Sequence, residues 1–191
     1  MVGKKNVVFG FLYLVLTAAL GPYMVVSLSQ SLTDAGGKKQ EVLGEIQLMK
    51  SNQFMSEETL ETMSGAQIAK KNTDGLLAIN GLINAEMAFD QVKANPHAHG
   101  NLESLLNIAA GLVLGLVAVS AAFKQLISWC FILGALLHSG MLYLRDAFGL
   151  GWAAAWLESP LGFIGPLLIL LGLLLAGIAA WAGYRGEPVR D

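Results

Sequence analysis

Four stretches of this chain carry almost no charge and are long enough to cross a lipid bilayer. They are residues 7–28, 105–123, 126–144 and 161–184. A helix rises about 1.5 Å per residue, so about 20 apolar residues cross a hydrocarbon core of roughly 30 Å. Backbone polar groups in lipid must be hydrogen-bonded within the segment, which favours helices. The sequence therefore predicts an all-α integral membrane protein with four transmembrane helices.

The charge content supports this class and excludes another. Only 14% of the 191 residues are charged, against roughly a quarter in soluble domains. The net charge is −2, and no basic cluster is longer than a pair of lysines. Nucleic-acid binding needs a basic surface that neutralises phosphates, so the sequence predicts no nucleic-acid partner. The single cysteine, Cys130, lies in an apolar run, which excludes a disulfide framework and a cysteine-based zinc motif.

The first apolar run follows two lysines, as a signal peptide would. The apolar core of a signal peptide usually has roughly 7 to 15 residues and precedes a small-x-small cleavage site. The run 7–28 is longer, and Pro22 lies where it would kink a span rather than end it. We therefore expect a retained N-terminal transmembrane helix.

The second and third runs are separated only by Lys124 and Gln125. So short a connection makes the two helices antiparallel neighbours, a helical hairpin. The lysines and arginines of short loops then set the orientation, because they stay on the cytoplasmic side. An N terminus in the cytoplasm places one group of basic residues there: Lys4, Lys5, Lys124, Arg185 and Arg190. Only Arg145 falls in the short outer loop between the third and fourth helices.

This orientation gives a domain plan for a bacterial inner (plasma) membrane protein with both termini in the cytoplasm. It comprises an N-terminal transmembrane helix (1–28), an exoplasmic helical segment in the periplasm (29–104), a three-helix transmembrane bundle (105–184) and a cytoplasmic tail (185–191).

The exoplasmic segment is predicted to be a small helical cap. Apolar residues recur at helical spacing within 42–49 and 74–92, and Ser56 is suited to cap a helix followed by acidic residues. We expect two or three short helices lying on the outer membrane face.

Polar residues cluster where the second apolar run begins. His99, Glu103 and Asn107 follow one another at intervals of four residues. If the helix starts near Pro96, a residue suited to a first turn, these side chains line one face. His97 lies about 200° from His99 around a helix, so the two are not expected to bind one ion.

The third histidine, His138, lies inside the third run, roughly 9 Å below the outer boundary at 1.5 Å per residue. An ionisable residue at that depth is by default a candidate functional residue whose partner must be named. Glu103 and Asn107 are the candidate partners, since they belong to the same hairpin. The alternative is a structural one, in which each imidazole only hydrogen-bonds a neighbouring helix.

Two kinds of cofactor fit these residues. A copper or zinc ion would use His99, Glu103 and His138, because neutral imidazole suits both metals. Haem b needs an axial histidine, an apolar pocket and a cation near its propionates, which Arg145 could supply. Of the two, haem b is the favoured expectation.

Residues 97–145, about a quarter of the chain, resemble the central hairpin of the styrene-oxide-isomerase-like proteins. The matching positions are Ala98-His99, Asn107, Lys124, Gly140 and Tyr143. Members of that family are small four-span bacterial membrane proteins that bind haem b. The resemblance implies that His99 is the axial ligand and that Asn107 and Tyr143 face the substrate.

Two functions from different classes follow. The first is a haem- or metal-binding membrane protein. It would be a Lewis-acid isomerase-like enzyme if one metal face is open, or a redox module if His99 and His138 close both faces. The second is a non-enzymatic accessory or assembly subunit, because the glycine and alanine faces are more than four spans need to pack against one another. The expected partners are the lipid bilayer and either further copies of the chain or other membrane subunits.

Overall fold

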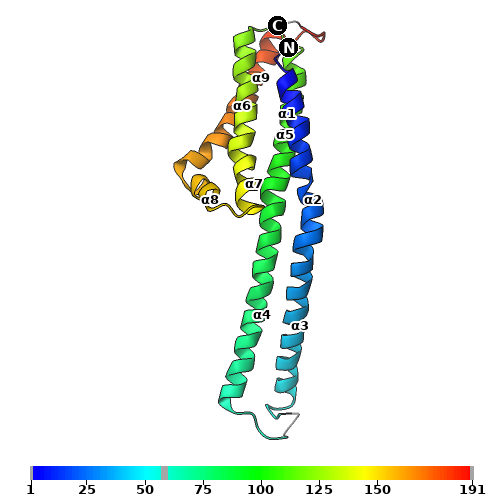
Figure 1. Cartoon of the computed structure of the whole chain (residues 1–191), viewed down its shortest axis with the longest axis vertical. Coiled ribbons are helices and arrows are strands. Elements are labelled where there is room, and N and C mark those ends of the chain that lie inside the picture. The colour runs from blue at the N-terminus through cyan, green and yellow to red at the C-terminus, as the bar shows by residue number, and fades with distance from the viewer. Residues whose placement is uncertain (1, 57–59, 190–191) are drawn as a thin grey trace. The chain divides into compact units, whose positions relative to one another are not determined.

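The computed structural model describes residues 2–56 and 60–189, which fold into helices without any β-sheet (Figure 1). In chain order these are α1 (Lys4–Ala18), α2 (Leu20–Tyr23), η1 (Met24–Leu28), α3 (Ser29–Ser51), α4 (Gly65–Val92), η2 (Lys93–His97), α5 (Ala98–Leu114), α6 (Ala121–Ala135), η3 (Leu136–Gly140), α7 (Met141–Asp146), α8 (Gly151–Glu158), η4 (Pro160–Phe163) and α9 (Ile164–Gly183). The segments η1, η2 and η3 are π-helical turns and η4 is a 3₁₀ turn.

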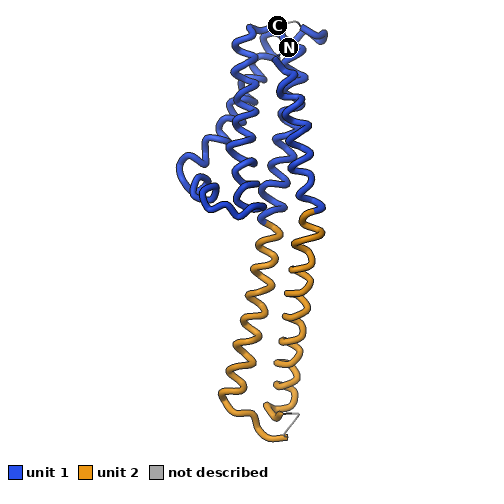
Figure 2. Tube along the Cα trace, viewed as in Figure 1, with its two compact units in different colours: residues 1–22, 91–191 blue, residues 23–90 orange. Residues whose placement is uncertain are grey.

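The chain divides into two compact units (Figure 2). Unit 1 comprises Met1–Pro22 and Gln91–Asp191, and unit 2 comprises Tyr23–Asp90. The predicted exoplasmic segment, 29–104, covers most of unit 2 and the beginning of α5. The beginning of α5 belongs to unit 1 because it packs along α1.

Unit 1 is a helix bundle in which α5 lies between α1 and α6, and α9 packs on α6. Its apolar core joins α5, α6 and α9 and contains Ala110, Leu114, Val117, Ile127, Phe131, Ile169 and Ala179. The antiparallel pairing of α5 with α6 agrees with the predicted hairpin.

The outward faces of three helical stretches are strongly apolar. Exposed side chains include Phe11, Leu12, Val15 and Leu16 on α1, Leu126, Trp129 and Leu133 on α6, and Leu167, Leu170 and Leu174 on α9. By length and composition, Lys4–Ser51, Ala121–Asp146 and Pro160–Gly183 can each cross a membrane. Three of the four predicted spans therefore have a helix of the required kind. The remaining one, α5, carries polar side chains through its first ten residues: His99, Asn101, Glu103, Ser104 and Asn107.

The predicted second helix, 105–123, is wrong in its C-terminal part. The helix α5 ends at Leu114, and residues 115–120 form a linker before α6. This linker pairs with the segment after α9: Ala118 N–H donates to Gly183 O at 2.7 Å and Arg185 N–H donates to Leu116 O at 3.0 Å. Lys124, predicted to lie in the connection, is instead in the first turn of α6 and is 1% exposed.

One end of unit 1 therefore gathers the start of α1, the 115–120 linker and the segment after α9. The Lys5 Nζ also contacts Gln125 Oε1 and lies 4.1 Å from the centre of the Trp129 ring. The orientation inferred from the basic residues requires these three segments to share a side, and the bundle brings them together.

Glycines set the close packing within unit 1. A Cβ on Gly111 would lie 2.6 Å from Gly3 O, and one on Gly165 would lie 2.6 Å from His138 N. A Cβ on Gly134 would meet Ile169 at 2.8 Å. The small-residue faces read from the sequence are thus largely used inside the chain, between α1 and α5 and between α6 and α9.

Unit 2 consists mainly of two long helices, α3 and α4, with a turn between them. The prediction of two or three short helices is therefore wrong in helix length. The helix predicted after Ser56 would begin at 57–59, which lie outside the described residues, and residues 60–64 are not helical. The cap of α4 is Ser64, whose N–H donates to Gln67 Oε1 at 2.8 Å while Gln67 N–H donates to Ser64 Oγ at 3.3 Å. This reciprocal pair is a capping box.

Candidate metal-binding site

The three residues predicted to bind a metal lie together in unit 1. His99 and Glu103 are one turn apart on α5, and His138 lies in η3, which interrupts the third predicted span between α6 and α7. One ligand atom from each residue can be chosen so that all lie within 4.8 Å of one another. A π-helical turn inserts an extra residue into a helix, and such turns are frequent at functional sites. Here it directs both His138 and Ser139 toward α5.

Glu103 is the centre of the cluster. Its side chain is 5% exposed, and its Oε1 lies 2.5 Å from His138 Nδ1. Its other oxygen, Oε2, accepts a hydrogen bond from Ser139 Oγ at 2.5 Å. A buried carboxylate must be paired and hydrogen-bonded to remain ionised in a low-dielectric interior, and Glu103 has both kinds of partner. Of the two partners expected for His138, the structure selects Glu103.

The hydrogen bonds continue from Ser139 to the first helix. Tyr13 is buried on α1, and its hydroxyl lies 2.9 Å from Ser139 Oγ. Four side chains thus follow one another in the order Tyr13, Ser139, Glu103 and His138, and they come from α1, η3 and α5.

His99 closes the cluster on its open side. Its ring centre is 4.8 Å from that of His138, with the planes at 64°, an edge-to-face contact. His99 is exposed, whereas the side chain of His138 is 19% exposed. Two nitrogen ligands of one tetrahedral zinc ion are separated by roughly 3.4 Å, since each bond is about 2.1 Å. One ligand atom from each of the three residues lies within 4.8 Å of the others, so a shared ion would draw them slightly closer together.

Asn107 lies in a separate polar network. Its Nδ2 donates to Glu103 O at 3.0 Å and to Phe131 O at 3.2 Å, and its Oδ1 accepts from Asn6 Nδ2 at 3.0 Å. Asn6 also donates to Ser128 O at 3.1 Å. Asn107 is 0% exposed. Its hydrogen bonds connect α1, α5 and α6.

Arg145 and Tyr143, the other residues singled out from the sequence, lie in α7. Arg145 forms a two-point ion pair with Asp146, with Nε to Oδ1 at 2.5 Å and Nη2 to Oδ2 at 2.9 Å. Tyr143 is partly exposed and packs on Phe148 at 5.5 Å between ring centres. Neither residue belongs to the group around Glu103.

His97 points to α1 and not to the cluster. Its Nδ1 lies 3.1 Å from Thr17 O and 3.4 Å from Asn101 Nδ2. The expectation that His97 and His99 do not share an ion agrees with this placement.

Three residues of these networks were not predicted: Tyr13, Ser139 and Asn6. Tyr13 and Ser139 are single polar residues within apolar runs, and Asn6 follows Lys5 just before the first run begins. The signal that could have found them is the glycines of α1 and α5, because helices in close contact must satisfy any polar group they bury.

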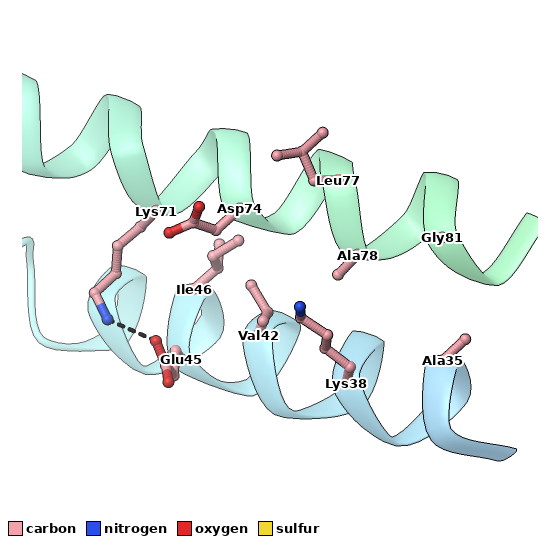
Figure 3. A pocket seen from close by; sticks show the side chains of 10 residues that line it. All are labelled: Ala35, Lys38, Val42, Glu45, Ile46, Lys71, Asp74, Leu77, Ala78 and Gly81. Atoms are coloured by element: carbon pink, nitrogen blue, oxygen red, sulfur yellow. Dashed lines mark hydrogen bonds and ion pairs between the residues drawn. The ribbon is translucent and has the colours of Figure 1, made fainter. Parts of the chain in front are cut away.

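Unit 2 contains an open groove of about 430 Å³ between α3 and α4 (Figure 3). Its floor is apolar, with Val42, Ile46 and Ala78 among the lining residues. At one end, Lys71 Nζ pairs with Glu45 Oε2 at 2.6 Å. Exposed ion pairs of this kind contribute little to stability, and nothing in the groove resembles the Glu103 cluster.

In comparisons with known proteins, no family model, curated protein or solved structure matches the chain.

Proposed function

We propose that this chain is a membrane protein with four membrane-crossing helices that binds a transition-metal ion through His99 and His138, with Glu103 in support. The observation that carries the proposal is the gathering of two imidazoles and a buried carboxylate within 4.8 Å. An ionisable cluster in an apolar bundle is costly and is a functional-site hypothesis by default.

The helix α5 is proposed as the fourth span although its composition is polar. It lies beside α1 and α6, two stretches suited to cross a membrane, so it occupies the same depth. Its polar side chains Glu103, Ser104 and Asn107 are buried against those neighbours. Polar residues within a membrane bundle face its interior in this way.

The site belongs near the membrane face opposite the 115–120 linker. From the start of α6 to His138 there are 17 residues, which is about 26 Å of helix at 1.5 Å per residue. That length nearly crosses a hydrocarbon core of roughly 30 Å. A bacterial inner membrane with the termini in the cytoplasm would then place the site at the periplasmic face.

The ligand set favours zinc or copper. Imidazole suits both metals, whereas hard cations such as Mg²⁺ and Ca²⁺ prefer oxygen ligands. Two histidines are fewer ligands than the three of catalytic zinc sites or the four of structural ones, so they would leave coordination positions open. An open position permits Lewis-acid or redox chemistry on a molecule that arrives from the membrane surface.

Haem b fits this geometry less well. Two axial imidazoles must stand on opposite faces of the macrocycle, but His99 and His138 touch edge to face at 4.8 Å between ring centres. Arg145 already pairs with Asp146. A haem held by His99 alone is the version that the family resemblance supports. A Soret band in the visible spectrum of the purified protein would reveal it, and the His99→Ala variant would lose it.

The alternative of an accessory subunit loses its main support, because α1, α5, α6 and α9 use most of their glycines among themselves. Purification in mild detergent followed by mass spectrometry tests it, and a stoichiometric partner subunit would favour it over an independent metal protein.

Metal titration tests the main proposal. Purified protein in detergent is titrated with Zn²⁺ and, separately, with Co²⁺, whose visible absorption reports coordination. His99→Ala and His138→Ala should each weaken binding at least 100-fold, because each removes a ligand. His97→Ala is the matched control: it removes an imidazole two residues from His99 and should bind as the wild type does. Binding that survives both His99→Ala and His138→Ala would contradict the proposal.

A further inference from the structure

The hydrogen bonds around Glu103 indicate where the protons lie. Ser139 Oγ lies within hydrogen-bond distance of two acceptors, Glu103 Oε2 at 2.5 Å and Ala135 O at 3.2 Å, and its single hydrogen is assigned to the closer one. Tyr13, 2.9 Å from Ser139 Oγ, must then be the donor in that contact. His138 Nδ1 is 2.5 Å from Oε1. An arrangement in which Glu103 accepts a hydrogen bond on each oxygen places a hydrogen on Nδ1 of His138.

This proton arrangement separates the roles of the two residues. A neutral imidazole that carries its hydrogen on Nδ1 presents a lone pair at Nε2. Histidines that bind metals commonly donate their other ring N–H to a carboxylate, which fixes the tautomer and raises the basicity of the ligand nitrogen. Glu103 already has the place that a carboxylate takes behind a metal-binding histidine, since its Oε1 contacts His138 Nδ1, although each of its oxygens keeps a further lone pair.

We propose that Glu103 is a positioning residue that holds His138 in the Nδ1–H tautomer, with Tyr13 and Ser139 fixing the carboxylate from behind. The metal ligands are then His138 Nε2 and His99, and the remaining positions are open to water or substrate. This inference rests on the proposed function for the metal itself, but the tautomer of His138 and the Tyr13–Ser139–Glu103 chain are properties of the protein alone.

The first test needs no metal. Protein labelled with ¹⁵N-histidine is studied by NMR in alkaline buffer, where the imidazoles are neutral, and His138→Ala identifies the signals of His138. The wild type should show His138 protonated at Nδ1. Glu103→Gln should keep this tautomer, because the amide oxygen can accept the same hydrogen bond, whereas Glu103→Leu should populate both tautomers. A wild-type His138 protonated at Nε2 would overturn the inference.

The second test separates a positioning residue from a ligand. With Glu103→Gln, Co²⁺ should bind roughly 10- to 100-fold more weakly, as is typical when a residue behind a metal ligand is changed, and the shape of its visible spectrum should stay the same. Ser139→Ala and Tyr13→Phe, which leave Glu103 and both imidazoles in place, should weaken binding less than Glu103→Gln does. A changed Co²⁺ spectrum in Glu103→Gln would identify Glu103 as a direct ligand and overturn the inference.

The proposed metal binding and the proposed role of Glu103 can be refuted separately. Wild-type protein that binds neither Zn²⁺ nor Co²⁺ would contradict the proposed function. The NMR result on His138 would still decide whether Glu103 and its two hydroxyl neighbours hold that ring. If Glu103→Leu does not fold, Glu103→Gln and Ser139→Ala keep the inference open to refutation.

Discussion

At the scale of single residues, the buried amides that join α1, α5 and α6 are hydrogen-bonded by their neighbours, whereas the buried Trp156 Nε1 in α8 has no partner among the described residues. Asn6 and Asn107 are both 0% exposed, and their amides bond to each other and to the carbonyls of Ser128 and Phe131. An unsatisfied polar group in such surroundings costs more than a satisfied one contributes. The network therefore specifies how α1, α5 and α6 fit together.

Removal of Asn107 should accordingly destabilise the protein. Asn107→Ala leaves the Asn6 amide and the Phe131 carbonyl without their partner, at a cost of about 1–3 kcal/mol. Asn101→Ala is the comparison, because Asn101 is only partly buried and water can replace its bond to Thr17. Unfolding of both variants in detergent, followed by circular dichroism, should show the larger loss for Asn107→Ala. Equal losses of stability in the two variants would mean that the buried network contributes no more to stability than a partly exposed hydrogen bond does.

At the scale of elements, one glycine of α9 supports the backbone beside the candidate metal-binding residue His138. Gly165 abuts the backbone of η3, so that a Cβ would lie 2.6 Å from His138 N, whereas a Cβ on Gly177 meets nothing within 4 Å. The two glycines share a helix but only one touches the site. They therefore form a matched pair for testing whether packing between α9 and η3 holds His138 in place.

Gly165→Ala should push α9 away from η3 and weaken Zn²⁺ binding, together with an overpacking cost of roughly 1–3 kcal/mol in stability. Gly177→Ala should leave Zn²⁺ affinity unchanged and stabilise the helix slightly, since alanine favours helix over glycine by about 1 kcal/mol. Zinc titration and thermal unfolding of both variants check this. An unchanged Zn²⁺ affinity in Gly165→Ala would show that the site does not depend on this contact.

The elements also show how far the sequence could predict the structure. Hydrophobicity and length located the helices of the first, third and fourth runs, and intervals of four placed His99 and Glu103 on one face. The end of α5 was missed, because Val117 and Val119 kept the linker apolar. Gly115 at the end of α5 and Ser120, whose Oγ accepts from Phe123 N–H at 3.3 Å, are the local signals that mark the break.

The juxtaposition of Ser139 with Glu103 was beyond sequence reasoning for a different reason. Regular helical spacing cannot show which residues face α5 after the π-helical turn η3, which shifts the faces of the helix by one residue. Tyr13 joins the site only because glycines let α1 approach α5. Both effects depend on packing between segments far apart in the chain.

At the scale of the whole molecule, the decisive question is whether α5 crosses the membrane. If it does, Ser120 in the linker lies on the same side as Glu187 after α9, and on the opposite side from Thr62, which lies between α3 and α4. If α5 does not cross, Ser120 and Thr62 share a side. The buried Cys130 is the only cysteine, so a Cys130→Ala background permits single reporters at chosen positions.

Labelling of single cysteines in that background with a membrane-impermeant maleimide answers the question. Vesicles of one orientation should label Ser120→Cys and Glu187→Cys, and vesicles of the opposite orientation should label Thr62→Cys and Phe148→Cys. The reason is that an odd number of crossings separates the two groups: three lie between Thr62 and Glu187, and one lies between Ser120 and Phe148. Detergent-solubilised protein, in which all four react, is the control for intrinsic reactivity. Joint labelling of Ser120→Cys and Thr62→Cys would contradict a fourth span. It would also place the Glu103 cluster on a helix that does not cross the bilayer, and the case for a metal site between membrane-crossing helices would fail with it.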